Sequence, residues 1–267
     1  MKTRPGAGES PAKPGDQLGA HGVKVDLAAA LATRTTYSVF DTWIIGLSPL
    51  IVHAWSQKAK TEMLTKQVKA VKGAGRAQRN PEQDFVDSLY AMPDDALGRK
   101  AFGFPATGVK KAILSAAHKD KGLAKTAVLS SLWLDAPMVS VRTALAGAVC
   151  DLPLVRVYGD DPVMREDMVR VGAGLNKTAT LAYRAQFRRW AVNLKGRFNT
   201  AVMSPSALAF LIEESGLGTG IGEWRNEKSG VFGAFSLATA EQEAAWRAFA
   251  TGTGPLPTAA ELSLAAE

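Results

Sequence analysis

The chain has 267 residues, of which 46% are hydrophobic, and a formal net charge of +7. This length and apolar fraction suit one large or two small domains with a hydrophobic core, and no apolar run approaches the roughly 20 residues of a membrane-spanning helix. The start has no apolar segment after its basic residues, so we expect no secretion signal, and the single Cys150 excludes an internal disulfide and a cysteine-based zinc site. We therefore expect a cytoplasmic protein, in the bacterial host cytoplasm if it is phage-encoded.

Composition and periodicity divide the chain into three parts. Residues 1–35 are rich in Gly, Ala and Pro and predict a flexible arm, residues 36–238 predict an ordered core with a helical insertion at about 54–100, and residues 239–267 predict a short helix and a tail. The core begins with a β-branched and aromatic segment, Tyr37–Gly46, which predicts a strand covered on both faces.

The insertion that follows the turn at Ser48–Pro49 has a basic helical face opposite an apolar one. Such a face is either solvated or grips the phosphates of a nucleic acid strand. We predict that it grips them through Lys58, Lys66, Lys69, Lys72, Arg76 and Arg79.

Helix-start signals recur further along. Asn80-Pro81-Glu82-Gln83 has the form of a capping box with proline at the first helical position, Ser204-Pro205 has a related form, and Thr239 precedes a C-terminal helix with acids in its first turn. A third helix follows Phe104–Thr107 with its apolar stripe facing the core, and Lys110 and Lys111 lie off that stripe.

Strands are predicted between these helices. Residues 128–157 suggest several strands, with breaks at 135–137 and 151–153, and 190–198 alternates most clearly. Its apolar side chains point one way, while Lys195 and Arg197 form a basic open face. We expect Gly216 to end the helix that begins after Ser204, and Trp55 and Trp190 to lie in the core.

A glycine-rich loop, Gly218-Thr219-Gly220-Ile221-Gly222, follows that helix. A dinucleotide-binding fingerprint requires glycines between a strand and a following helix, and no Gly-Lys-Ser/Thr is present for a P-loop, so both of these sites are excluded. The segment is either a plain loop that ends a helix or a loop that meets phosphates while an aromatic ring stacks on a base. In the second interpretation the binding residues are Gly220, Gly222, Trp224, Arg225 and Lys228.

The order of elements (strand, insertion, helix, strands, helix, strand) is that of an α+β, ferredoxin-like or RRM-like antiparallel sheet with a helical thumb or finger after the first strand. Three segments also resemble the repeat-associated (RAMP) superfamily, especially the RNA-binding backbone subunits of CRISPR effector complexes. Gly46–His53 is similar to the loop after the family's opening strand, Phe104–Leu114 to its "Pro-x-Ser-Ser-Leu-Lys-Gly" helix start, and Gly218–Phe235 to its glycine-rich loop and final strand. The chain also resembles bacteriophage proteins of similar length.

The resemblance implies RNA binding by an assembling subunit, and one departure bears on catalysis. Some backbone subunits cut RNA with an aspartate in the loop after the first strand, but residues 48–59 contain no carboxylate. Processing relatives use a histidine, for which His53 is the only nearby candidate. We therefore expect no catalytic residue, cofactor or metal.

We predict a non-enzymatic protein that coats single-stranded RNA or DNA without sequence preference, as an open homo-oligomer or helical filament, with no membrane partner. Two alternatives remain: a metal-independent RNA endonuclease that uses His53 with a nearby lysine, and a phage structural protein that reuses the fold.

Overall fold

The computed structural model describes residues 36–55, 57–67, 80–117, 123–143, 145–171 and 178–258. By its internal contacts the chain divides into a unit of residues 1–35 and a unit of residues 36–267, and all described residues belong to the second. The predicted N-terminal arm and most of the C-terminal tail lie outside the described residues.

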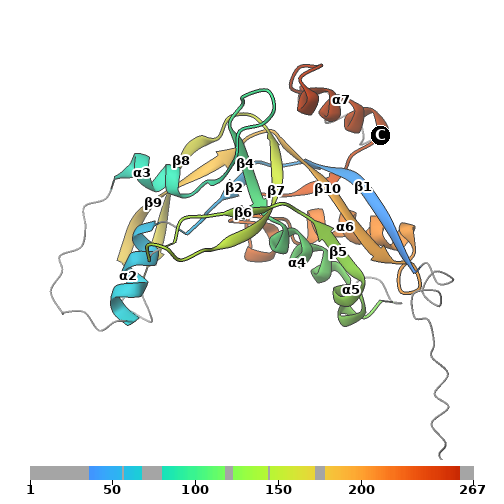
Figure 1. Cartoon of the computed structure of the whole chain (residues 1–267), viewed down its shortest axis with the longest axis horizontal. Helices are drawn as coiled ribbons and strands as arrows, with labels where there is room; N and C mark the ends of the chain where they lie inside the picture. Colours follow the sequence, from blue (N-terminus) through green and yellow to red (C-terminus); the bar gives the residue numbers. More distant parts are fainter. Residues whose placement is uncertain are drawn as a thin grey trace, which may run out of the picture. The chain divides into compact units, whose positions relative to one another are not determined.

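The described part is an α+β fold built on a large antiparallel sheet (Figure 1), which confirms the predicted fold class. The main sheet has the order β11-β1-β10-β7-β4-β3, with β5 paired to β10 and β6 paired to β7, and a second sheet has the order β2-β9-β8. The strands are β1 Tyr37–Gly46, β2 Leu50–Val52, β3 Tyr90–Met92, β4 Ala101–Pro105, β5 Leu132–Asp135, β6 Met138–Ser140, β7 Asp151–Gly159, β8 Val163–Val171, β9 Thr178–Phe187, β10 Trp190–Asn199 and β11 Phe235–Leu237.

Helices pack on both faces of the main sheet. The helices are α2 Gln57–Gln67, α3 Pro81–Asp87, α4 Ala106–Ala116, α5 Lys125–Ser131, α6 Pro205–Gly218 and α7 Ala240–Thr251. Alternate residues of β10 separate the two faces. Val192 and Leu194 are buried in the core formed with α4 and α6, whereas Ala191 packs with Trp43 and with Trp246 of α7. Figure 1 shows α7 on one side of the main sheet and α4, α5 and α6 on the other.

Local sequence signals account for the helix ends. The Asn80 side chain accepts from the Gln83 amide and Pro81 follows it, and the Ser204 side chain accepts from the Ala207 amide at the start of α6. Among the described helices only α7 has the full capping box, between Thr239 and Gln242. In α3 the box is half made, because the Gln83 side chain donates to Asp87 (2.8 Å).

Several predicted details are wrong. The first half of β1 is open, with Val39 79% exposed, because α7 covers only the second half. Residues 125–131 form helix α5, and β7 runs without a break through Pro153, which pairs with edge strand β6. Gly216 does not end α6. It lies inside the helix, which continues to Gly218. A glycine is needed at this position because a Cβ would come within 1.8 Å of the Phe235 carbonyl oxygen.

A cluster of one aspartate and two arginines joins the connection between β3 and β4 to α7. The Asp95 side chain, 5% exposed, accepts from Arg99 Nε and Arg156 Nη2, both at 2.7 Å. Arg99 also donates to the carbonyls of Phe249 (3.1 Å) and Ala250 (2.9 Å) near the end of α7. The hydrogen bond from Arg156, with those from Arg99, holds the pKa of Asp95 far below its ordinary value.

The acid stability of the fold should therefore depend on Asp95. A carboxyl whose pKa is depressed by folding adds stability above its unfolded pKa, near 3.9, and loses that contribution as the pH falls below it. We expect Asp95→Asn to lower the melting temperature at neutral pH and to flatten its decline between about pH 5 and pH 2. Thermal unfolding followed by circular dichroism tests this prediction. The control is the same substitution at the exposed neighbouring residue, Asp94→Asn. A variant curve parallel to the wild-type curve would contradict the prediction.

Candidate nucleic-acid interface

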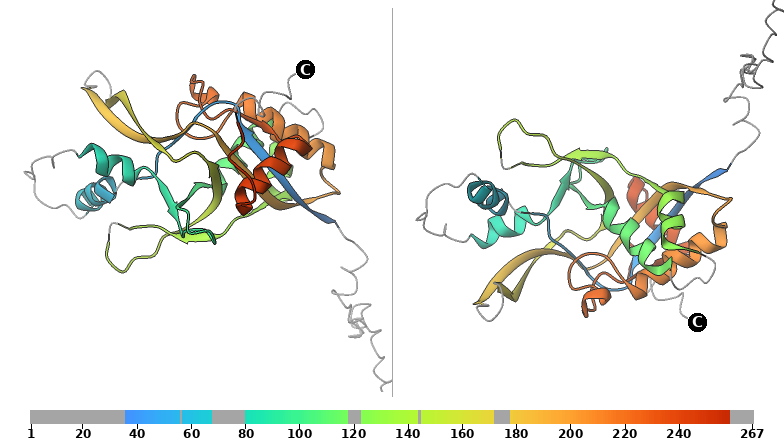
Figure 2. Two further views of the ribbon diagram at one scale, coloured as in Figure 1. Left: turned by 90° about the horizontal axis from the view of Figure 1, so that it is seen from above. Right: turned by 90° about the horizontal axis from the view of Figure 1, so that it is seen from below.

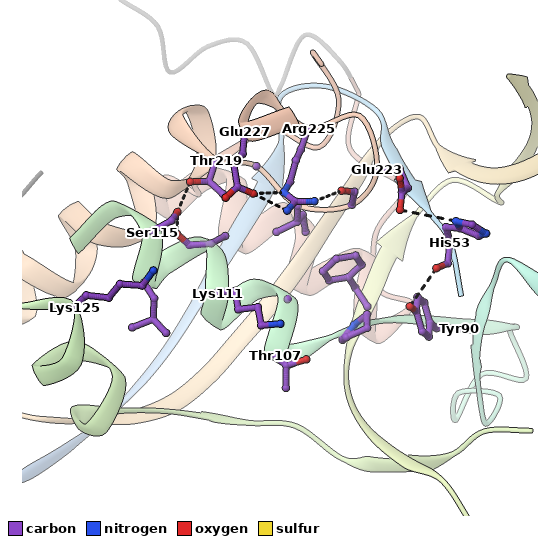
Figure 3. Close-up of a pocket in the computed structure, with 18 residues that line it drawn as sticks. His53, Tyr90, Thr107, Lys111, Ser115, Lys125, Thr219, Glu223, Arg225 and Glu227 are labelled. Carbon is purple, nitrogen blue, oxygen red and sulfur yellow. Dashed lines mark hydrogen bonds and ion pairs between the residues drawn. The ribbon is translucent and has the colours of Figure 1, made fainter. Parts of the chain in front are cut away.

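A cleft of about 500 Å³ lies between α4, the start of α5 and the loop after α6. Figure 3 shows Lys111 of α4 and Lys125 of α5 on one side of it, and Glu223 and Arg225 of the loop on the other. His53, which follows β2, stands at one end. The cleft thus joins segments that lie far apart in the sequence.

The turn between β1 and β2 holds the far end of the glycine-rich loop in place. The amide of Leu47 donates to the Ala234 carbonyl (2.9 Å), and the Ser48 hydroxyl accepts from the Ala234 amide (3.0 Å). The Pro49 carbonyl accepts from the Gly233 amide (2.8 Å). These bonds tie both backbones together, so the loop is a fixed wall of the cleft.

Two glycines of the loop are required by its conformation. Gly220 and Gly222 have φ of +70° and +83°, a region that L residues rarely adopt. A Cβ on Gly222 would lie 2.4 Å from the carbonyl oxygen of Ile51, which accepts from the Glu223 amide (2.9 Å). The Gly220 amide donates to the Ser215 carbonyl (2.8 Å). The amides of Gly220 and Glu223 are therefore used within the fold, and these glycines shape the cleft instead of offering those amides to a ligand.

The charged and aromatic residues of the loop differ in their surroundings. Arg225 donates from two nitrogens to Glu227 (3.0 and 2.6 Å) and from a third to the Gly222 carbonyl (3.0 Å), so its charge is largely balanced within the loop. Trp224, at a φ of +52°, is 41% exposed, and Lys228 is exposed, but neither lines the cleft. Of the predicted loop residues, the structure brings only Gly220, Gly222 and Arg225 to the cleft.

Two lysines face the cleft without an ion pair. Lys111 and Lys125 are both exposed, and among the described residues no carboxylate lies within 4.0 Å of either ammonium group. The first turn of α4, with Thr107, also lines the cleft, and its N-cap residue, Pro105, supplies no side-chain cap. Uncapped amides and the helix dipole favour a negative charge there.

Lys110 lies in a neighbouring groove, where Trp133 and Pro137 also line the wall, and burial lowers the pKa of Lys110. The sequence did not identify Lys125, because residues 128–131 of the helix that begins with it were predicted as strand.

Lys195 and Arg197 lie on the opposite face of the sheet from α4, so they do not complete this cleft. Both are paired there, Lys195 with Asp41 (3.3 Å) and Arg197 with Asp135 (3.2 Å). The predicted single basic surface is wrong on this point, because alternation along β10 that sends its apolar residues toward α4 sends these cations the other way.

The predicted basic finger is described only in part. Lys58 and Lys66 lie within α2, after β2, where a helical insertion was expected. Lys69, Lys72, Arg76 and Arg79 lie outside the described residues.

His53 has a carboxylate neighbour that the sequence did not reveal. Its Nδ1 lies 3.9 Å from Glu223 Oε1, and both side chains are a little under half exposed. The Tyr90 hydroxyl donates to the His53 carbonyl (3.4 Å). Burial and the nearby charge of Arg184 lower the pKa of His53 despite the opposing effect of Glu223, so the imidazole is neutral at neutral pH.

Neither a metal centre nor a membrane-spanning helix occurs in the described parts of the chain. These parts hold no group of three or more His, Cys, Asp or Glu residues arranged to bind a metal ion. They also contain no helix that is long and apolar enough to span a membrane.

No protein-family model and no curated protein sequence matches the chain. Among solved structures, the chain is similar to the crystal structure of Cmr6 from Pyrococcus furiosus, with a TM-score of 0.31 and 10% sequence identity over 77% of this chain and all of that one. A likeness at this TM-score establishes neither family nor function. Membership of the RAMP superfamily stays a prediction, and we base the functional proposal on this chain's own residues.

The close approach of Gly222 to Ile51 gives a direct test of the loop. Gly147 has nearly the same φ, +82°, but open space around it, so Gly147→Ala measures the cost of the backbone conformation alone, about 1–2 kcal/mol. We expect Gly222→Ala to lower the melting temperature more than Gly147→Ala does, since it adds a clash with backbone. Equal melting temperatures for the two variants would show that the loop moves aside and is not a fixed wall.

Proposed function

We propose that this protein binds single-stranded nucleic acid, RNA or DNA, in the cleft between α4 and the glycine-rich loop. The observation that carries the proposal is a pair of lysines, Lys111 and Lys125, that form no ion pair with the described residues and lie beside the uncapped start of α4. Both are donors suited to phosphate oxygens, and an uncapped helix start favours a negative group at the same place. A rigid glycine-containing wall lets a strand approach the backbone closely.

The sequence motifs that resemble RAMP backbone subunits support the same choice of ligand. They also lead us to propose that copies assemble along the strand as an open homo-oligomer, without sequence preference and without catalysis. Heterologous contacts of that kind produce filaments, whose mass should grow with the length of the added oligonucleotide.

The role of the two lysines is tested by a double substitution, Lys111→Ala with Lys125→Ala. We expect weaker binding of labelled single-stranded oligonucleotides in fluorescence anisotropy. The slope of log affinity against log salt should also be smaller by about 1.4, because each phosphate that is no longer neutralised removes roughly 0.7 from it.

The matched control removes Lys195 and Arg197 together, two cations on the other face of the sheet. That control changes the net charge equally, so equal losses in the two double variants would mean that binding follows overall charge, and the cleft would be rejected as the site.

A second function is favoured by the proximity of His53 to Glu223 in the same cleft. In a metal-independent RNA endonuclease, neutral His53 would take the proton of a ribose 2′-hydroxyl as its oxygen attacks the adjacent phosphorus. Lys111 would give a proton to the leaving 5′-oxygen. The products are a 2′,3′-cyclic phosphate and a 5′-hydroxyl end.

This alternative predicts cleavage of RNA, but not of DNA, in the presence of EDTA, and its loss in His53→Ala. Because the pKa of His53 is lowered, the base form persists below its ordinary pKa of about 6.5, and activity should decline only at more acidic pH. Gel analysis of end-labelled RNA gives the answer. Intact RNA after long incubation with the wild-type protein would leave binding as the function.

A further inference from the structure

A second groove, of about 580 Å³, continues from the cleft toward the helical insertion. Tyr90, Pro105 and Thr107 line both, so the two form one track. The far wall of the groove includes Trp55, which follows β2, and Arg142, in the connection between β6 and β7. Figure 2 shows that connection and the insertion with α2 and α3 projecting toward the same side.

Trp55 is 63% exposed, so the expectation that it lies in the core is wrong. Its backbone is nevertheless fixed. The amide of the preceding Ala54 donates to the Ser88 carbonyl (2.8 Å), and the buried Ser88 hydroxyl accepts from the Ala185 amide of β9 (2.8 Å). Exposing the apolar face of an indole to water is unfavourable, and an indole on an anchored backbone loses little conformational freedom when it binds a flat partner.

Two cationic residues, Lys60 and Arg142, line the same groove as this ring. Lys60 of α2 donates to the Arg142 carbonyl, which links the insertion to the connection between β6 and β7 across the groove. The Arg142 side chain is exposed. Among the described residues, the one carboxylate that lines the groove is Asp87, which accepts a hydrogen bond from Gln83 (2.8 Å). The groove therefore offers an aromatic face with positive charge beside it, which matches a base and its phosphate.

We infer that Trp55 is a base-stacking residue, and that a single strand runs from Lys111 and Lys125 past Tyr90 to an unpaired base stacked on the Trp55 indole. This inference rests on the proposed function, because it extends the same binding track. It assigns base contact to Trp55 instead of Trp224, which does not line either cavity.

The test compares Trp55→Ala with Trp133→Ala. Both rings are 63% exposed, and Trp133 lies on β5, paired with Arg197 of β10. Binding of two labelled oligonucleotides of equal length is measured by anisotropy: one single-stranded DNA with bases, and one abasic DNA that has the same phosphates. Thermal unfolding of both variants checks that each is folded.

We expect Trp55→Ala to lose roughly 5- to 150-fold in affinity for the oligonucleotide with bases and little for the abasic one, the range that stacking of one base supplies. Trp133→Ala should bind both as the wild type does. If Trp55→Ala binds the base-containing strand as well as the wild type, the inference fails while the proposed function stands. If the wild type binds neither oligonucleotide, the proposed function fails, and the inference that rests on it fails too.

Discussion

The candidate site depends on how one tryptophan is buried. Trp190, at the start of the central strand β10, is fully buried, and its indole nitrogen donates to the Ser48 carbonyl (2.8 Å). Gly46 makes room for the ring, because a Cβ there would lie 2.2 Å from that nitrogen. An indole N–H without a partner would be costly in this core, so the turn after β1 is held to the sheet. That turn carries the Leu47, Ser48 and Pro49 contacts to the glycine-rich loop, and the core thereby fixes a wall of the cleft.

The positive charge available to a ligand depends on which cationic side chains are already paired with carboxylates. On the open sheet face, Asp41 pairs with both Lys195 (3.3 Å) and Arg247 of α7 (2.9 Å), and hydrogen bonds from Asn193 and Arg247 lower the pKa of Asp41 against the opposing effect of burial. A net charge of +7 therefore does not make that face a site for a polyanion. Lys111 and Lys125 matter more than their number suggests, because no carboxylate of the described residues pairs with either of them.

The sequence predicted what local patterns determine. Strand β1, the Pro81 and Pro205 helix starts and the buried stripe of α4 follow from alternation, capping residues and helical periodicity. The sequence did not predict what long-range contacts determine. The contact between His53 and Glu223 brings together residues 170 positions apart in the chain, and the backbone beside the exposed Trp55 is held by the hydrogen bond from Ala54 to Ser88. The β8–β9 hairpin was not predicted, because polar and apolar residues are mixed along strands that lie partly outside the main core.

The balance of charge in the track determines how it would select a strand. Among the described residues, the cationic side chains that line the cleft and the groove are Lys60, Lys111, Lys125, Arg142 and Arg225. The carboxylates that line them are Asp87, Glu223 and Glu227. For the proposed strand, an excess of two positive charges in this described lining would give only a shallow salt dependence, so stacking and shape would supply much of the binding free energy. Because a duplex hides the faces of its bases and an unpaired strand exposes them, the proposed track would favour single strands over duplexes more strongly than a purely basic groove would.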